Sequence, residues 1–143
     1  MVIFAEKRPK LSENLTQHVS EWAYNLRFED LPPQVVANVK RGCLDFVVLA
    51  LAGSSGKGVG AIRRGGVEPV IACAGANTGE CTVIGTDVTT LPQYAALANG
   101  TFGHALNLMD VHRGSVPTHI GPTIFPAAFA VSQVIKTDFP TFA

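Results

Sequence analysis

The segment 104–119 holds most of the side chains that could carry out chemistry. Three of the four histidines of the chain lie in it, with one amide, one carboxylate and one guanidinium: His104, Asn107, Asp110, His112, Arg113 and His119. An imidazole can take up or release a proton near neutral pH, and a guanidinium can clamp a carboxylate with two hydrogen bonds. The segment therefore predicts a polar site suited to proton transfer and to binding an anionic group.

These residues also have alternative interpretations. His104 falls inside a predicted helix, where it can be a packed and hydrogen-bonded structural histidine. His112 and Arg113 can be the exposed surface of a loop. His104, Asp110, His112 and His119 are all metal-ligand types, although the spacing His-x5-Asp-x-His matches no compact zinc motif. A structural role and a metal site therefore stay open beside a catalytic role.

The sequence shows no motif for a bound cofactor, and we expect none. The glycine-rich stretch 53–60 has the composition of a phosphate-binding loop but lacks its spacing. A Walker motif would need glycine at Leu51 and serine or threonine at Gly58. We interpret this stretch as a loop that follows the end of a helix.

Four helices are predicted to position the polar segment. Apolar spacing and capping residues place them at 12–26, 31–52, 91–110 and 121–135, with weaker helical pieces within 59–76. The first helix carries one apolar stripe that should be buried. The second is apolar almost all round after residue 46, so it should lie at the centre and end at Gly53. In a third helix that continues to Asp110, His104 and Asn107 would share one face.

The composition indicates one mainly α domain with at most one short extended segment, at 81–84. Of the 143 residues, 47% are hydrophobic and 15% are charged. Residues 1–11 are interpreted as a flexible lead and residues 12–143 as an incomplete helical domain. Alanines and glycines in the third helix predict close approach of another helix. Because so few residues are charged, we expect another chain or another subunit to cover part of the surface.

Charge and cysteine content exclude several other classes of protein. The net charge is +0 without a basic cluster, which argues against a nucleic-acid partner. The longest apolar run is far shorter than the ~20 residues of a membrane span. Three cysteines without a C-x-x-C pair, and an N-terminus that lacks a basic segment followed by an apolar one, predict an intracellular, cytoplasmic protein.

The stretch from Pro92 to Ala130 resembles the MmgE/PrpD family. The similarity is carried by the run NGTFGHALNLMDVHRGS and by THIGPTIFPAAFA, which follows it closely. Upstream, LPP at residues 31–33, ALAG at 50–53 and TVIG at 82–85 are similar too. Members of this family include 2-methylcitrate dehydratases, cis-aconitate decarboxylases and iminodisuccinate epimerases.

The resemblance implies a fold and an activity. The family has a large all-α domain that carries the site, an α+β lid domain and usually a homodimer. This chain would be only the N-terminal part of the helical domain, with the lid domain absent. The absent parts would cover the small-residue face of the third helix, and we expect a homo-oligomer, namely a dimer. The implied activity is cofactor-independent lyase or isomerase chemistry on small di- or tricarboxylates, nominally that of a 2-methylcitrate dehydratase.

The resemblance also implies site residues. The family pattern is His-Ala-Leu-Asp-φ-Asp-Asp, where φ is apolar, then a loop with His-Pro-Gly. His104, Asp110 and His119 match it, whereas Asn107 and Met109 replace two acids. Ile120 replaces the proline of the loop.

From this pattern we expect catalytic roles for four residues and substrate binding by two more. The catalytic set is His119, His104, Asn107 and Asp110, and the binding set is Arg113 and His112. The alternative is a catalytically inactive helical remnant that acts only by self-association or by pairing with a full-length paralogue.

Overall fold

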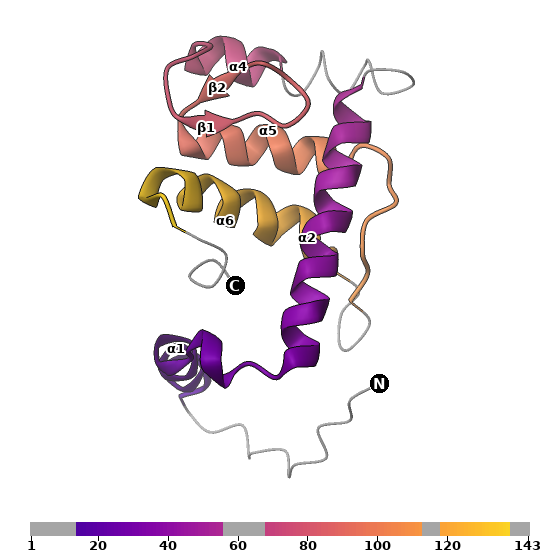
Figure 1. Cartoon of the computed structure of the whole chain (residues 1–143). Coiled ribbons are helices and arrows are strands. Elements are labelled where there is room, and N and C mark those ends of the chain that lie inside the picture. The colour runs from indigo at the N-terminus through magenta and orange to yellow at the C-terminus, as the bar shows by residue number, and fades with distance from the viewer. Residues whose placement is uncertain (1–13, 56–67, 113–117, 138–143) are drawn as a thin grey trace. The chain divides into compact units, whose positions relative to one another are not determined.

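The computed structural model describes residues 14–55, 68–112 and 118–137. Its helices are α1 (Leu15–Asn25), α2 (Pro33–Ser54), α4 (Glu68–Ala74), α5 (Pro92–His104) and α6 (Gly121–Ile135), with a 3-10 turn at Phe28–Asp30 (Figure 1). Two short strands, β1 (Cys81–Thr82) and β2 (Thr89–Thr90), form an antiparallel pair. The mainly α prediction is confirmed. The expectation of at most one extended segment is wrong, because β2 pairs with β1.

The described residues divide into two units, one that ends at Leu31 and one that begins at Pro32. The helix of the first unit, α1, has no buried residue, and its apolar stripe of Leu15, Val19 and Trp22 is exposed. Nothing within this unit covers the stripe, so its predicted burial stays a prediction. The predicted division after residue 11 lies outside the described residues and stays a prediction.

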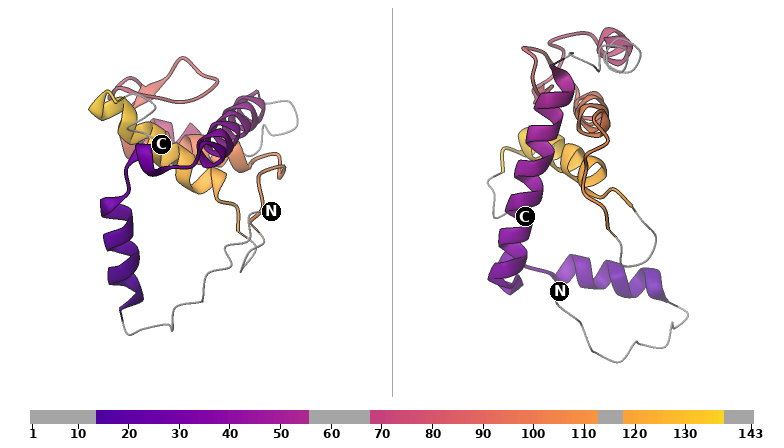
Figure 2. Two further views of the ribbon diagram at one scale, coloured as in Figure 1. Left: turned by 60° about the horizontal axis from the view of Figure 1, so that its bottom comes forward. Right: turned by 90° about the vertical axis from the view of Figure 1, so that its right-hand side faces the viewer.

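The second unit is built on three helices. Both α5 and α6 lie side by side, and α2 crosses them (Figures 1 and 2). The buried core between them contains Phe46 from α2 together with Ala98 and Phe102 from α5. The ring centroid of Phe46 lies 6.0 Å from that of Phe125 and 5.8 Å from that of Phe129. Burial of these aromatic rings holds α2 on the pair formed by α5 and α6.

Glycines let α2 and α5 approach each other closely. Gly53 was predicted to end its helix, but α2 continues to Ser54 and Gly53 is buried inside it. A Cβ at Gly53 would overlap the carbonyl oxygen of Phe102, and one at Gly103 would lie 2.6 Å from the ring of Phe46. Three residues of the small-residue face of α5, Ala95, Ala98 and Gly103, are buried within this chain. For these three, the prediction that parts outside the chain cover the face is wrong.

The buried side-chain amide of Asn99 links the strand pair to α5 through hydrogen bonds. The Asn99 side chain accepts a hydrogen bond from the backbone N–H of Ile84 at 2.8 Å and donates one to the carbonyl of Thr82 at 2.9 Å. Only 2% of Asn99 is exposed. An amide can satisfy both a donor and an acceptor of the backbone, so this residue joins the hairpin to the helix without leaving either group unpaired.

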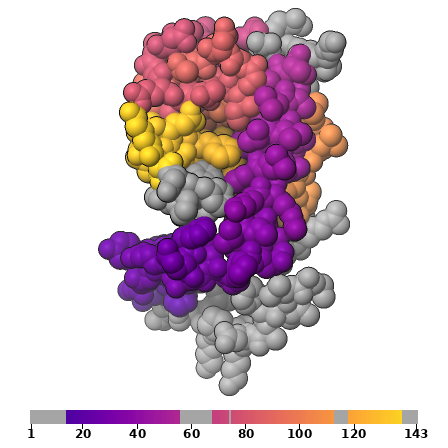
Figure 3. Space-filling model, in the orientation of Figure 1, coloured from indigo at the N-terminus to yellow at the C-terminus, as the bar shows by residue number. Residues whose placement is uncertain are grey.

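Part of the apolar surface of the second unit stays uncovered. In the second half of α2, Phe46 and Ala50 are buried, whereas Val48 and Leu51 are exposed. The prediction that this half of the helix is covered all round is therefore wrong for the described residues. Figure 3 shows α2 at the surface beside the hairpin and α6. Exposed apolar side chains also lie on α6, at Ile124, Val131, Val134 and Ile135.

Candidate functional site

The segment that carries the predicted site begins where α5 ends. This helix ends at His104, six residues before the predicted end at Asp110. The backbone N–H of Asn107 then donates to the carbonyl of His104, and Asn107 has a φ of 54°. Asparagine tolerates this left-handed conformation better than most residues. The prediction that His104 and Asn107 share one face of a continuous helix is therefore wrong.

Two predicted histidines come together in the tertiary structure. The ring centroids of His104 and His119 lie 5.6 Å apart, and the ring planes meet at 86°. His104 is the last residue of α5, and His119 lies just before α6. His104 is exposed and His119 is half-buried. The exposure of His104 argues against a buried structural histidine, and its role stays a prediction.

Asp110 connects this pair to the start of α6. The Nδ1 atom of His119 lies 2.8 Å from the backbone carbonyl oxygen of Asp110. The Oδ1 atom of the same Asp110 accepts a hydrogen bond from the backbone N–H of Gly121 at 2.9 Å. One residue thus holds both the ring of His119 and the first residue of the next helix.

The loop between the two helices is closed at its base by a short antiparallel bridge. The N–H of His112 donates to the carbonyl of Thr118 at 2.8 Å, and the N–H of Thr118 donates back at 3.2 Å. The side chains of Asn107 and His112 are exposed. Arg113 lies outside the described residues, so its predicted role in substrate binding stays a prediction.

The two replaced acids of the family pattern lie in different surroundings. Asn107 is exposed, whereas only 6% of Met109 is exposed. A carboxylate at position 109 would be buried, which is costly without a partner. The methionine therefore suits its place in this structure, and the amide at 107 is the replacement that faces solvent.

A groove of about 400 Å³ runs between α5 and α6 with His104 in its wall. The hydroxyls of Thr101 and Thr123 also line it, and each donates to a backbone carbonyl, of Leu97 and His119 respectively. The other lining residues are small or apolar: Ala96, Leu97, Gly100, Pro122, Pro126 and Ala127. Among the described residues that line this groove, His104 is therefore the one that can exchange a proton.

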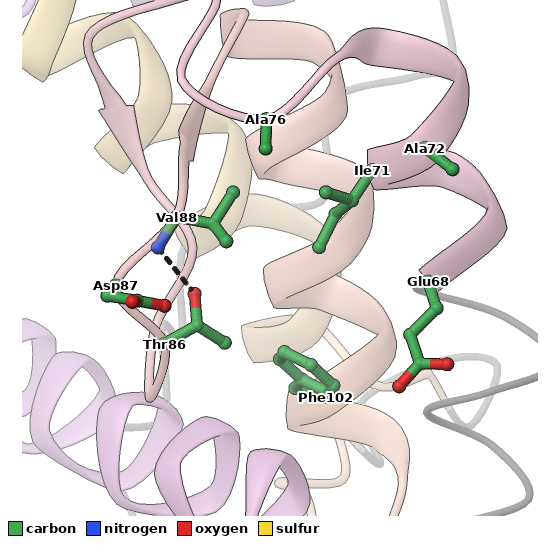
Figure 4. A pocket seen from close by; sticks show the side chains of 8 residues that line it. All are labelled: Glu68, Ile71, Ala72, Ala76, Thr86, Asp87, Val88 and Phe102. Atoms are coloured by element: carbon green, nitrogen blue, oxygen red, sulfur yellow. Dashed lines mark hydrogen bonds between the residues drawn. The ribbon is translucent and has the colours of Figure 1, made fainter.

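A second cavity, of about 270 Å³, lies away from the histidines (Figure 4). Helix α4, the turn between the strands and α5 surround it, and Phe102 closes one side. It has two carboxylates in its lining, from Glu68 and Asp87, and is otherwise mainly apolar. No histidine from the described part of the chain lines it. The cavity and the predicted chemistry therefore do not coincide.

The surroundings of two cysteines raise the pKa of their thiols. Burial raises the pKa of Cys43, and burial together with the charge of Glu80 raises the pKa of Cys81. The Cys81 thiol also donates to the carbonyl of Ala130 at 3.3 Å. Both thiols are thus held in the protonated form, which is a poor nucleophile. Across the described ranges, no group of three or more His, Cys, Asp or Glu residues could hold a metal ion.

The sequence did not predict which residues of the segment meet. His104 and His119 are fifteen positions apart, and nothing in their spacing indicates contact. One available signal was the residue before Gly121, because Ile120 occupies the cap position of α6 and has no side-chain acceptor. A helix that starts without a local cap needs an acceptor from elsewhere, and Asp110 supplies it.

Comparison with known proteins identifies the family. The sequence-family model of the MmgE/PrpD N-terminal domain matches residues 17–141. The chain belongs to the MmgE/PrpD family. Within this MmgE/PrpD chain, the matched range covers both histidines of the pair and all the helices that position them.

Two curated relatives are similar to this MmgE/PrpD chain along most of its length. A cis-aconitate decarboxylase-like protein of Aspergillus oryzae is 33% identical over 125 residues, which cover 85% of this chain and 24% of the relative. A cis-aconitate decarboxylase of Aspergillus terreus is 33% identical over 133 residues, which cover 90% and 25% respectively. The chain thus spans about a quarter of the length of these relatives. No solved structure matches it significantly. None of the helices in the described residues could cross a membrane.

Proposed function

We propose that this chain carries a proton-transfer site of an MmgE/PrpD-type lyase that acts on a small di- or tricarboxylate without a cofactor. The observation that carries the proposal is the His104–His119 pair, whose ring centroids lie 5.6 Å apart, with His104 in the wall of the groove between α5 and α6. Two imidazoles beside each other can divide the work of taking a proton and returning one.

The chemistry required of the site is proton transfer at the carbon next to a carboxylate. In a dehydration, a base removes that proton and hydroxide leaves. In a decarboxylation, the carbon–carboxylate bond breaks, carbon dioxide leaves, and an acid delivers a proton to the carbon that holds the electron pair. His119 and His104 are the proposed proton carriers, and Asn107 can orient the substrate through hydrogen bonds. Arg113 and His112 are proposed to bind its carboxylates.

Similarity favours one substrate for the first test. The two relatives reported above are named for cis-aconitate, so we propose cis-aconitate ahead of 2-methylcitrate, the nominal choice from the sequence. Both are tricarboxylates, and both need the same proton carriers. The proposed partners are this substrate and a second copy of the chain.

A second candidate function is non-catalytic association. Asn107 cannot accept a proton, and apolar side chains are exposed on α2 and α6, at Val48, Leu51, Val131 and Ile135. A helical remnant could use this surface to pair with itself or with a full-length paralogue. Sedimentation of the purified chain as a monomer, with and without a full-length family member, would exclude this candidate.

The test of the lyase is turnover by the purified chain. Cis-aconitate and 2-methylcitrate are incubated separately with the protein in D2O, and proton NMR follows substrate loss and deuterium uptake. We expect turnover of cis-aconitate, and a loss of about 10²-fold or more in His119→Gln, because that variant lacks the proton carrier. His18→Gln is the matched control, since His18 is an exposed histidine on α1.

Three outcomes would count against the proposed mechanism or against the lyase itself. Full activity in His119→Gln would remove that histidine from the mechanism. Equal losses in His119→Gln and His18→Gln would show a general effect of replacing histidine. Absence of turnover of both substrates would reject the activity for this chain and leave association as the remaining candidate.

A further inference from the structure

The cap of α6 is unusual because its acceptor comes from far along the chain. The cap residue Ile120 has no side-chain acceptor, and Pro122 has no N–H, so the N–H of Gly121 is the one that needs an acceptor from elsewhere. Asp110 supplies it with Oδ1, which lies 2.9 Å from the N–H of Gly121 across eleven residues. A carboxylate at a helix N-terminus is also favoured by the helix dipole. The contact therefore fixes Asp110 against the start of α6.

Gly121 shows how close this contact is. A Cβ at Gly121 would lie 2.5 Å from Oδ1 of Asp110, which is nearer than a side-chain carbon can approach. Gly121 is buried, and its N–H is the donor in the contact. The same contact can therefore be broken from either side, at the carboxylate or at the glycine.

The backbone of Asp110 performs a second task. Its carbonyl oxygen lies 2.8 Å from Nδ1 of His119. A carbonyl can only accept, so Nδ1 must carry the hydrogen in this contact. In the neutral imidazole the lone pair is then on Nε2, which becomes the nitrogen that takes up a proton. A partner on one ring nitrogen thus decides the tautomer of the ring.

We infer that Asp110 is a positioning residue, which holds His119 in the Nδ1–H tautomer with Nε2 as its basic nitrogen. Its carboxylate fixes the peptide through Gly121, and its carbonyl orients the ring. This inference rests on the proposed function for the use made of Nε2. It replaces the direct proton-transfer role that the sequence pattern predicts for Asp110, because the carboxylate is engaged by the helix.

The experiment measures the tautomer directly. Nitrogen-15 is introduced into the histidines of the whole chain, and two-bond proton–nitrogen correlation spectra distinguish Nδ1–H from Nε2–H rings. The His119→Gln spectrum assigns the signals of His119. In the wild-type chain we expect the Nδ1–H pattern for His119, because the carbonyl of Asp110 can accept only from a protonated Nδ1.

Three variants break or keep the contact. Asp110→Ala removes the acceptor and Gly121→Ala displaces it, so both should change the His119 pattern towards a mixture of tautomers. Asp110→Asn keeps an oxygen that can accept from Gly121, so it should keep the wild-type pattern. Asp87→Ala is the matched control, because Asp87 is an exposed aspartate in the turn between the strands. Circular dichroism verifies that each variant is folded.

Activity on cis-aconitate is measured on the same proteins. A misplaced catalytic group can cost about 10²-fold in rate, so we expect losses of that order in Asp110→Ala and Gly121→Ala. Asp110→Asn should retain most of the activity. In the double variant Asp110→Ala/Gly121→Ala, the second change should add little, because both act on one contact.

Two results would overturn the inference. One is an Nε2–H pattern for His119 in the wild-type chain. The other is an Asp110→Asn protein that keeps the wild-type tautomer but loses as much activity as Asp110→Ala, since the carboxylate itself would then handle a proton. An expected tautomer pattern without any turnover would support the positioning role and reject the proposed lyase, so the two failures are distinguishable.

Discussion

Asn99 and Asn107 lie eight positions apart, and their surroundings differ in almost every respect. Asn99 is buried in α5, and both ends of its amide are paired with the backbone of the strand segment. Asn107 lies past the end of the same helix, exposed and with a left-handed backbone. Asn99 belongs to the packed half of the second unit, where α2, α5, α6 and the strand pair meet. Asn107 belongs to the polar edge, the segment from His104 to His119 that carries the histidines.

The contrast shows how this domain separates stability from chemistry. In the packed half, polar groups are enclosed and satisfied, and glycines bring backbones close together. At the edge, His104 is exposed and His119 uses one ring nitrogen for orientation. Substitutions in the packed half should therefore change mainly the free energy of unfolding, and those at the edge mainly the reaction.

The largest effect on stability is expected from Gly53→Ala. The new Cβ would overlap the carbonyl of Phe102, so α2 and α5 would have to separate, at a cost of about 3 kcal/mol in unfolding free energy. Gly42→Ala is the matched control in the same helix. There the Cβ would lie 3.0 Å from the edge of the Phe125 ring, and better helix propensity offsets the contact. Urea unfolding measures the unfolding free energy of both variants. Equal losses in Gly53→Ala and Gly42→Ala would contradict the predicted close approach at Gly53.

A slightly smaller effect is expected from Asn99→Leu. Leucine can fill the space of the asparagine side chain, but it leaves the N–H of Ile84 and the carbonyl of Thr82 unpaired. The unfolding free energy should fall by about 2–3 kcal/mol. Thermal and urea unfolding followed by circular dichroism measure the change. Gln93→Leu, at an exposed position of the same helix, should change it by less than about 0.5 kcal/mol. A change as small at Asn99 would show that its amide does not hold the hairpin.

The smallest effect on stability is expected at Asn107. Its size depends on whether the new residue tolerates a left-handed backbone. A β-branched residue fits a φ of 54° poorly, so Asn107→Val should lower the unfolding free energy by about 1–2 kcal/mol. Asn107→Gly adopts the same φ without strain and should leave stability nearly unchanged. Similar values for both variants would mean that the turn after α5 does not require the left-handed conformation.

Local patterns in the sequence determined much of this protein. Apolar spacing and proline-containing starts predict α2 and α6, and α6 has the predicted bounds of Gly121–Ile135. The motif residues from Pro92 to Ala130 indicate the MmgE/PrpD family, which the match to residues 17–141 confirms. These features depend on residues that are close in the sequence, so periodicity and motif spacing can reveal them.

Only the tertiary structure decided which of those residues meet. The end of α5 at His104 depends on a left-handed turn, and the role of Gly53 depends on its contact with Phe102, which lies 49 positions later in the sequence. The His104–His119 contact and the Asp110–Gly121 hydrogen bond both join the two sides of a loop. Helical periodicity carries no information about such pairs, because their distances are set by how α5 and α6 pack. The sequence thus predicted the polar segment, whereas the packing of α5 and α6 determined which of its residues are in contact.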